Sequence, residues 1–474
     1  MPSQIGELSP HDWMMDYNTF IPRLFNLCLS HGFEPGRIMP SRAFCSDENQ
    51  GFPIILIAKH FGAFPFDHGR VGGIVAAGRH GPHAHHGKDL VIIQASHVGY
   101  DPKTGCFGTY RRLQTEDHAL STSCGKICAV LHWYLDEYKF AQDSIFLTRM
   151  GSDKVVIIDN QLLDPERPCG VFLHLDRFVR LRGDSPPDPI RVLSTSKAFP
   201  IAPSLEASLP PELFSDDRRT AMGERLSADM FYFKRQISGA PDAENHLERN
   251  LSVSMPKIVT SESPPLTAAH ANSQSEFDRI YRSIIKEHEY QGRNIAFVSG
   301  VNIDISPEKG QRFPLTKFIP WAGFIQRRTG QRIILEQDGL VEALSAQSDE
   351  NRYQFDLEAA VGAMTEKRVK AMLVDDEEDL VDALSKRLRA RRVGVTVAYD
   401  GATALGLAEE DEPEVMVLDL KMPGMDGIEV LERVRKRHPK MRVVMLTGYA
   451  TEADRKKCMD LGAHAFLEKP LDME

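Results

Sequence analysis

The sequence lacks any uninterrupted apolar run long enough to cross a bilayer, so no membrane-spanning helix is expected. Its N-terminus, MPSQIGELSPHDW, has no basic segment followed by an apolar one, and no signal peptide is expected. An excess of positive charge is also missing, since 57 Lys and Arg residues face 67 Asp and Glu residues. This balance disfavours broad binding to nucleic acids or to anionic membranes, and we expect neither as a partner.

Cysteine is scarce as well: seven cysteines are spread over 474 residues, without the dense spacing of a disulfide framework. We therefore expect reduced thiols and a cytoplasmic protein. Thiols in that compartment are buried small hydrophobic groups, reactive nucleophiles or metal ligands. Five of the seven are predicted to be ordinary packing residues: Cys28, Cys106, Cys128, Cys169 and Cys458.

The length of the chain predicts two to four domains. Hydrophobic residues make up 42% of the chain and charged residues 26%, which is typical of globular proteins. Residues 184–217 and 239–276 are rich in Pro, Ser and other loop-forming residues, and we expect loops or insertions there. We expect a first domain over residues 1–355, a connecting helix over residues 356–367 and a second domain over residues 368–474.

The last hundred or so residues alternate apolar strands with amphipathic helices. The predicted strands cover residues 370–374, 393–399, 415–418, 442–446 and 465–467. This alternation predicts a parallel sheet with helices on both faces. In such sheets the functional site lies at the carboxyl ends of the strands.

Acidic residues stand at two of those strand ends. Asp375 and Asp376 follow the first strand, and Asp419 ends the third. Carboxylates gathered in one pocket repel each other unless a cation neutralises them, and hard oxygen ligands suit Mg²⁺. With the ion in place, Asp419 could attack a phosphoryl group as a nucleophile. Thr447 offers a hydroxyl and Lys469 an ammonium group for the phosphoryl oxygens.

These residues resemble the response-regulator receiver family. The acidic pair, the run VLDLKMPGMDG, the LTG after the fourth strand and the EKP after the fifth occur in order and at family spacing. The resemblance implies a flavodoxin-like (βα)5 domain that is phosphorylated on Asp419 by a sensor histidine kinase or phosphotransfer protein. It also implies that Phe466 is the aromatic residue that rotates on phosphorylation. The alternative is an unrelated flavodoxin-like domain with surface carboxylates. Because the sequence stops at Glu474, we expect the domain without the family's last helix.

In the first domain, three metal-competent residues stand at the edges of predicted elements. Cys45 ends a candidate strand, His97 follows the apolar strand 90–95, and Cys124 opens the apolar helix 126–135. If the three meet, two thiolates and one imidazole would leave zinc an open fourth position, as in catalytic sites. Water bound there would ionise near neutral pH and could attack CO2. From residue types alone, buried cysteines and a hydrogen-bonded histidine remain the alternative.

A second resemblance favours the metal. The segments that carry it are CSDE at 45–48, a Gly-rich stretch, His85-His86, SHVG at 96–99, Tyr110-Arg111 and SCG at 123–125. They look like the limiting-CO2-inducible protein B/C family, and the likeness is best over residues 20–150. It implies a beta-carbonic-anhydrase-like α/β domain that hydrates CO2 to bicarbonate, with zinc on Cys45, His97 and Cys124. A homodimer at least is implied too.

The same resemblance implies a catalytic Asp–Arg dyad. Asp47 would be its acid and Arg111 its arginine, with Arg79 as the second candidate. Ser46 departs from those members that carry arginine at this position. Four further histidines lie in the segment RHGPHAHHGKD: we expect a polar loop for His80 and His83, and leave loop and active-site wall open for the other two. No separate chemistry is assigned to residues 151–355.

Together these patterns predict a two-component signalling protein that couples a phosphorylated receiver to a zinc-dependent, carbonic-anhydrase-like domain. Two alternatives stay open. The first domain could be non-catalytic and bind a ligand, metal or partner, or it could be a zinc enzyme with another small substrate.

Overall fold

The computed structural model describes residues 13–45, 50–67, 69–70, 74–75, 89–111, 120–183, 185, 187–215, 218–237, 243–307, 315–356, 369–391, 393–448 and 450–469. The chain divides into two compact units, an N-terminal unit (Met1–Asp356) and a C-terminal unit (Leu357–Glu474). The expected connecting helix falls almost wholly on residues outside the described ranges. Among the described residues, no helix combines the length and hydrophobicity that a membrane span requires.

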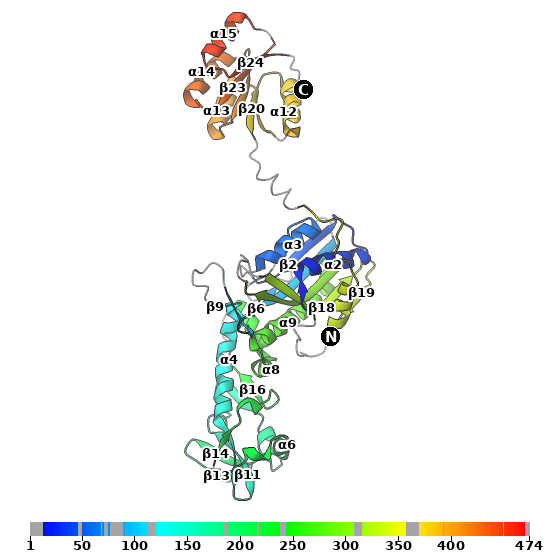
Figure 1. Ribbon diagram of the computed structural model, residues 1–474, viewed down its shortest axis with the longest axis vertical. Helices are drawn as coiled ribbons and strands as arrows, with labels where there is room; N and C mark the ends of the chain where they lie inside the picture. The colour runs from blue at the N-terminus through cyan, green and yellow to red at the C-terminus, as the bar shows by residue number, and fades with distance from the viewer. Residues whose placement is uncertain are drawn as a thin grey trace. The chain divides into compact units, whose positions relative to one another are not determined.

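The N-terminal unit is built on an eight-stranded mixed sheet (Figure 1). Its main path runs β1 (Met15–Asp16), β18 (Leu315–Gln326), β17 (Ile295–Ile305), β6 (Asp89–Asp101), β2 (Ile38–Ala43) and β3 (Phe66–Asp67). Off this path, β19 (Arg332–Leu335) pairs with β18 and β7 (Cys106–Phe107) with β6. Strands β17, β6, β2 and β3 are parallel, whereas β18 runs antiparallel to β17. Buried parallel strands explain why β6 and β17 read as long apolar runs.

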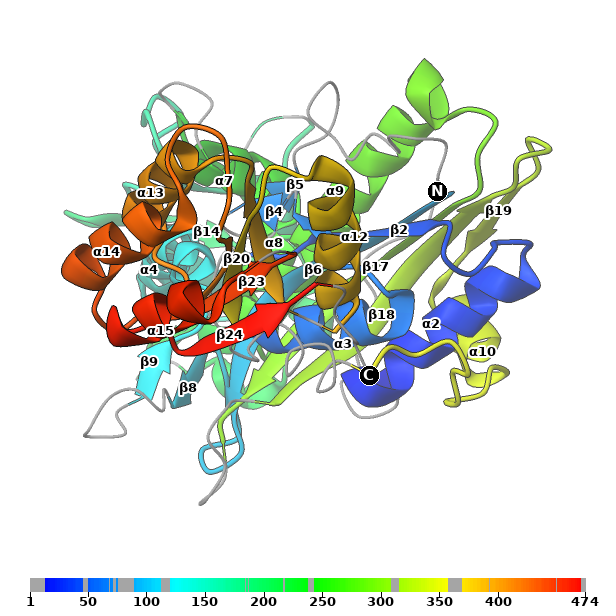
Figure 2. The same cartoon turned by 90° about the horizontal axis from the view of Figure 1, so that it is seen from above.

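Helices cover both faces of this sheet. One face packs against α2 (Tyr17–Ser30), α3 (Gly51–Phe61) and α10 (Gln337–Ser345), and Figure 2 shows α2 and α10 side by side. The other face packs against α9 (Pro264–Lys286). Successive side chains of a strand point to opposite faces, so neighbours in β6 meet different helices. Val91, Ile93 and Ala95 therefore lie in the first core, and Leu90 and Ile92 in the second.

Segment 239–276, expected to be a loop or insertion, is largely helical. It holds α7 (Ala243–Ser252), α8 (Met255–Val259) and the first half of α9. The prediction was wrong because the small and polar residues Ala268, Ala269, Asn272 and Ser273, which read as loop composition, form a buried helix face instead. Small side chains let α9 pack closely on β6 and β17.

A long helix, α4 (Gly125–Ser144), leads to a second, antiparallel sheet with the order β13–β14–β11–β10–β15. Its strands are Arg191–Val192, Ser196–Pro200, Asp153–Asp159, Ile145–Met150 and Thr220–Ala221. Segment 184–217, expected to be a loop or insertion, contributes β13, β14 and the helix α6 (Pro203–Ser208), so it is not a loop along its length. Two-stranded ribbons join β12 (Gly170–Leu173) to β16 (Phe231–Lys234), β4 (Gly69–Arg70) to β5 (Ile74–Val75), and β8 (Thr109–Arg111) to β9 (Leu120–Thr122).

The C-terminal unit alternates strands and helices along its whole length. In chain order these are β20 (Lys370–Val374), α12 (Glu378–Ala390), β21 (Gly394–Ala398), α13 (Gly401–Glu410), β22 (Val415–Asp419), α14 (Gly427–Arg437), β23 (Arg442–Thr447), α15 (Glu452–Asp460) and β24 (Ala465–Glu468). All neighbouring strands are parallel, in the order β21–β20–β22–β23–β24. The predicted doubly covered parallel sheet is confirmed.

Helices α13 and α14 cover one face of this sheet and α12 covers the other, as Figure 1 shows. Side chains cap the N-termini of α13 and α14. Asp400 accepts a hydrogen bond from the Thr403 amide at α13, and Asp426 accepts one from the Glu429 amide at α14. Thr451 and Asp454 form a reciprocal capping box at α15. These caps fix where each helix begins and hence how each strand–helix loop leaves the sheet.

Candidate functional site

The first candidate site lies at the carboxyl edge of the C-terminal sheet. Asp375 directly follows β20, and Asp419 is the last residue of the neighbouring strand β22; both are 5% exposed. The ammonium group of Lys469, which follows β24, lies 2.7 Å from Asp375 Oδ2 and 3.2 Å from Asp419 Oδ1. Three residues that lie far apart in the sequence thus meet at the strand ends, where the fold brings loops from parallel strands together.

The charges of this pocket influence each other. Burial raises the pKa of the Asp419 carboxyl and the nearby Asp375 adds to the rise, although the Lys421 amide and Lys469 oppose it. Burial alone would lower the pKa of Lys469, but its hydrogen bonds to Asp375 and Glu377 outweigh burial and raise that pKa. The pocket therefore holds a permanent cation, Lys469, shared between two buried carboxylates.

Three other residues were predicted for this pocket. Thr447 ends β23 and is 2% exposed, Asp376 is exposed next to Asp375, and Phe466 is half-buried against the core of the unit. The sequence reasoning missed Glu377, whose Oε1 lies 2.9 Å from Lys469 Nζ. Its position as the third acid in a row after β20 was the available signal.

The backbone next to Asp419 is held by a glycine. A Cβ at Gly427, the first residue of α14, would lie 2.1 Å from the carbonyl oxygen of Asp419. Only glycine permits this approach, so the start of α14 packs directly on the end of β22. The Gly at this place in the run MPGMDG thus has a steric role.

Comparison with known proteins agrees with this geometry. Residues 371–474 match the family model described as the response regulator receiver domain. The C-terminal unit is a response regulator receiver domain. The predicted flavodoxin-like fold of this unit and its place in two-component signalling are thereby confirmed. The match covers the receiver domain and does not extend into the N-terminal unit.

Solved structures of receiver proteins are similar to this chain. The Vibrio cholerae chemotaxis protein CheY4 is 28% identical, with 22% of this chain and 89% of that chain covered and a TM-score of 0.22. A receiver domain protein from Methanospirillum hungatei is also 28% identical, covering 22% of this chain and 85% of that one at a TM-score of 0.22. The non-phosphorylated HemR receiver domain from Leptospira biflexa is likewise 28% identical, with 22% of this chain and 86% of that chain covered and a TM-score of 0.22.

The second candidate site lies in the N-terminal unit. The ligand atoms of Cys45, His97 and Cys124 all lie within 4.8 Å of one another, and the three residues are 5%, 0% and 2% exposed. Cys45 follows β2, His97 lies within β6, and Cys124 directly precedes α4. The structure thus brings together the three residues that the sequence proposed as metal ligands. Two thiols and an imidazole are soft and borderline donors, which is the ligand set that zinc prefers.

The backbone at Cys124 is unusual. Cys124 has φ 53° and ψ 65°, and among the described non-glycine residues it alone has a positive φ. A left-handed conformation costs an ordinary residue roughly 1–2 kcal/mol, and such strain is concentrated at functional sites. The position immediately before α4 also places the sulfur at the positive end of the helix, which favours a thiolate.

His97 is held from behind by a buried acid. Its Nδ1 lies 2.7 Å from Oδ2 of Asp304, and both side chains are fully buried. Asp304 comes from β17, which pairs with β6 so that Asn302 is the register partner of His97. The sequence reasoning missed Asp304; the available signal was the pair Asn302 and Asp304 in an otherwise apolar strand.

The group as it stands favours bound protons. Burial would lower the pKa of His97, but the neighbouring Cys124, Asp304 and Cys45 outweigh it and raise that pKa well above its usual value. The hydrogen bond with Cys45 and burial raise the pKa of the Cys124 thiol despite the nearby imidazole. Metal binding at such a group displaces protons, so metal affinity depends on pH.

The other residues predicted for this site are those of the Asp–Arg dyad and the histidine cluster. Arg111 Nε lies 3.7 Å from Asp101 Oδ1. Asp47, Arg79 and the four clustered histidines lie outside the described residues, so the dyad and the histidine loop remain predictions. Of the five cysteines expected to pack, Cys106 and Cys169 are exposed, and that expectation was wrong for both.

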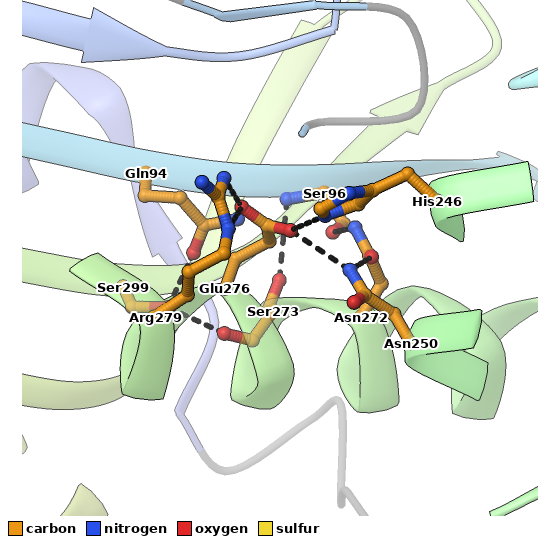
Figure 3. A network of polar contacts seen from close by, with 9 residues as sticks. All are labelled: Gln94, Ser96, His246, Asn250, Asn272, Ser273, Glu276, Arg279 and Ser299. Atoms are coloured by element: carbon orange, nitrogen blue, oxygen red, sulfur yellow. Dashed lines mark hydrogen bonds and ion pairs between the residues drawn. The ribbon is translucent and has the colours of Figure 1, made fainter. Parts of the chain in front are cut away.

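On the opposite face of β6, a second polar network begins at the residue before His97 (Figure 3). Asn272 donates to Ser96 Oγ at 2.8 Å, and Asn250 bridges Asn272 and Glu276 at 2.8 Å each. Glu276 is fully buried and also binds His246 and Arg279. Its charge is compensated by Arg279, so this network fixes α7 and α9 on the sheet and offers no ligand site.

Proposed function

We propose that this chain is a two-component signalling protein in which Asp419 takes a phosphoryl group and the N-terminal unit is a zinc-dependent, carbonic-anhydrase-like domain that hydrates CO2 to bicarbonate. The observation that carries the enzymatic part is the convergence of Cys45, His97 and Cys124 in a buried group. The signalling part is supported by the receiver match and by the pocket at Asp419.

In the receiver, Asp419 Oδ attacks the phosphorus of a phosphohistidine on a sensor kinase or phosphotransfer protein. The P–N bond breaks as the P–O bond forms, and the histidine leaves with its electron pair. Lys469 turns from the two carboxylates to the new phosphoryl oxygens, and the Thr447 hydroxyl donates to another. The oxygen donors Asp375, Asp376 and Asp419 fit Mg²⁺, which would neutralise charge during transfer. Phe466, half-buried in β24 three residues before Lys469, is the proposed aromatic switch.

In the N-terminal unit, Cys45, His97 and Cys124 would hold zinc. Two thiolates and one imidazole leave one tetrahedral position for water or substrate. Zinc, when bound, acts as a Lewis acid and makes water nucleophilic at neutral pH. Asp304 keeps the imidazole oriented, and the burial of all three ligands excludes competing solvent.

A specific observation favours an alternative. The three ligands are at most 5% exposed, whereas CO2 and bicarbonate must reach a catalytic zinc. A site so enclosed also fits a non-catalytic domain that holds zinc for stability or for sensing a partner or ligand. The enzyme and the non-catalytic domain would share the same metal site, and they differ in whether CO2 is hydrated there.

The test combines metal analysis with stopped-flow CO2 hydration on the full chain. We expect about one zinc per N-terminal unit and hydration faster than buffer. Cys124→Ala should remove both, whereas Cys128→Ala, one helical turn further along α4, should keep the metal. Zinc retained by Cys124→Ala would contradict the site. Zinc bound by the wild type with hydration no faster than buffer would contradict the enzyme and leave the non-catalytic alternative.

Coupling is the last part of the proposal. A phosphoaspartate adds negative charge that Lys469 and Thr447 can capture, which biases the receiver between two surface states. We propose that this change alters zinc access or subunit contacts of an at least dimeric protein. Hydration by the full chain should then differ before and after treatment with acetyl phosphate and Mg²⁺, and Asp419→Ala should abolish the difference.

A further inference from the structure

We infer that Asp304 is the positioning residue of the metal site, an inference that rests on the proposed zinc ligands. Its carboxylate binds Nδ1 of His97 at 2.7 Å, which leaves Nε2 as the ring nitrogen to ligate a metal. A carboxylate behind a ligating histidine fixes the tautomer and the ring angle. Asp304 lies 207 positions along the chain from His97, in a region to which the sequence assigned no chemistry.

Asp304 can do this because it is itself immobilised. Its Oδ1 accepts hydrogen bonds from Gln50 Nε2 at 2.9 Å and from Thr316 Oγ1 at 3.0 Å. Its Oδ2, which faces His97, also accepts from Gln50 at 3.1 Å and from Ser123 Oγ at 3.3 Å. Four protein groups from four separate segments thus hold one fully buried carboxylate in a single orientation.

The holders are anchored in turn. Asn302 donates to Gln50 Oε1 at 2.6 Å, and Tyr17 donates to Asn302 Oδ1 at 2.7 Å. Gln50 precedes α3, and Ser123 directly precedes Cys124, so each ligand segment contributes one side chain to the carboxylate. The network therefore ties the positions of all three proposed ligands to Asp304.

The charge balance separates Asp304 from an ordinary buried acid. Among the described residues, His97 is its one ion-pair partner, whereas Glu276 on the other face of β6 is paired with Arg279. A buried carboxylate without a permanent cation is expensive unless a nearby group carries positive charge. The group placed to carry that charge is the His97 imidazole, which becomes positive when it binds a proton or a metal ion, so Asp304 and His97 form a matched pair.

The test is zinc affinity of the full chain, measured by competition with a chelator. Asp304→Asn should weaken zinc binding by roughly 10- to 100-fold, the range found for partners of ligating histidines. Thr316→Val, which removes one holder of the carboxylate, should weaken it less while the protein stays folded. Glu276→Gln is the matched control, because it neutralises a buried acid on the opposite face and should leave zinc affinity unchanged.

A metal-independent measurement separates failure of this inference from failure of the proposed function. In metal-free protein, nitrogen NMR of labelled histidines, with His97→Gln to identify the signal, should show a proton on Nδ1 of His97. Asp304→Asn should shift that signal. If the wild type binds no zinc, the proposed function fails. If Nδ1 of His97 also carries no proton in that protein, the positioning role of Asp304 is overturned as well. If zinc binds and Asp304→Asn keeps its full affinity, the positioning role alone is overturned.

A different set of contacts concerns regulation, and we also propose that α3 carries the receiver's influence to this site. At its C-terminal end, Lys59 O accepts from the Phe355 amide at 2.7 Å, and Asn351 Nδ2 donates to His60 O at 3.1 Å. Asn351 is 5% exposed, and these residues are among the last described before the receiver. At its other end, Gln50 holds Asp304. A shift of segment 351–355 would therefore move α3, and Gln50 at the other end of α3 is hydrogen-bonded to Asp304.

The test follows the rate of zinc release from the full chain to a chelator, with and without acetyl phosphate and Mg²⁺. We expect phosphorylation to change this rate at least several-fold in the wild type and to leave it unchanged in Asn351→Ala. Asn26→Ala is the matched control, because Asn26 of α2 donates to Ser348 O and Glu350 O just before this segment, whereas Asn351 donates to His60 O at the end of α3. A response retained in Asn351→Ala overturns the role of α3, and no response in the wild type overturns the coupling as a whole.

Discussion

The two candidate sites of this protein differ in the hardness of their donors and in their access to solvent. The receiver pocket consists of carboxylates and one ammonium group, with exposed acids at its rim: Glu377 is 65% exposed, while Asp419 is nearly covered. The proposed metal site of the N-terminal unit consists of two thiols and one imidazole that are almost wholly buried. Exposed acids thus border the receiver pocket, whereas the three proposed metal ligands are all enclosed.

This difference follows from what each site must do. A phosphoryl group arrives on another protein, so its acceptor must lie at the sheet edge, where loops leave room. A soft metal ion is retained by ligands that are shielded and held in place, and shielding needs contributions from many segments. The receiver accordingly draws its groups from neighbouring strand ends, whereas the proposed metal site and its support draw on segments between Cys45 and Thr316.

The largest expected effect tests whether the two sites are chemically independent. Asp419→Ala should abolish labelling by radioactive acetyl phosphate, because it removes the proposed acceptor at the end of β22, and it should leave the zinc content unchanged. Asp460→Ala, an exposed acid at the end of α15, is the control and should label normally. Labelling that persists in Asp419→Ala would break the comparison on the receiver side.

A smaller effect is expected from the cation that bridges the acids. Lys469→Ala should slow phosphoryl labelling by roughly 10²-fold, the loss typical of one preorganised charge-stabilising donor. Lys456→Ala, on the exposed side of α15, should label at the wild-type rate. If both variants label equally fast, Lys469 serves only to neutralise Asp375 and Asp419.

Sterics at the acceptor strand provide a third test. Gly427→Ala should destabilise the receiver by roughly 1–3 kcal/mol, because the new Cβ overlaps the Asp419 carbonyl. Gly406→Ala in α13 meets no atom within 4 Å and should instead stabilise by up to about 1 kcal/mol through helix propensity. Urea unfolding followed by far-ultraviolet circular dichroism compares the two, and equal effects would contradict the packing described here.

The last test concerns the pH dependence of the stability of the N-terminal unit. Burial lowers the pKa of His270 to about 3, so this imidazole stays neutral in the folded state. As the pH falls below about 6.5, the unfolded chain gains a proton that the folded unit does not. Stability should therefore fall between pH 6.5 and 3, by an amount on the order of a few kcal/mol, and His270→Leu should flatten that fall.

All three tryptophans lie in the N-terminal unit, and Trp321 packs edge-on against His270. Tryptophan fluorescence during urea unfolding at several pH values thus reports on this unit. An unchanged pH slope in His270→Leu would show that the imidazole is not responsible.

The receiver could be predicted in detail because each reactive residue marks the end of an apolar strand. The five predicted strands agree with β20 to β24 within a residue or two, and helices alternate with them as expected. The metal ligands could be proposed through a family resemblance, since Cys45 and Cys124 stand 79 positions apart with no short metal motif. Nothing local in the sequence shows that these segments meet.

What could not be predicted depends on buried polar residues. Strand β6 was expected to end at Ala95 but continues to Asp101, because Ser96 and His97 interrupt the apolar pattern while remaining buried. The pair Asn302 and Asp304 marks a polar patch in the sequence, but the role of Asp304 follows only once β17 lies beside β6. The polar residues at the start of α9 misled for the same reason: their partners come from distant segments.

The most direct test of the proposed metal site is X-ray absorption at the zinc edge on the purified full chain. We predict two sulfur neighbours at about 2.3 Å and two nitrogen or oxygen neighbours at about 2.0–2.1 Å, with one sulfur lost in Cys45→Ala. A spectrum without sulfur, or one that Cys45→Ala leaves unchanged, would contradict a zinc site built from Cys45, His97 and Cys124.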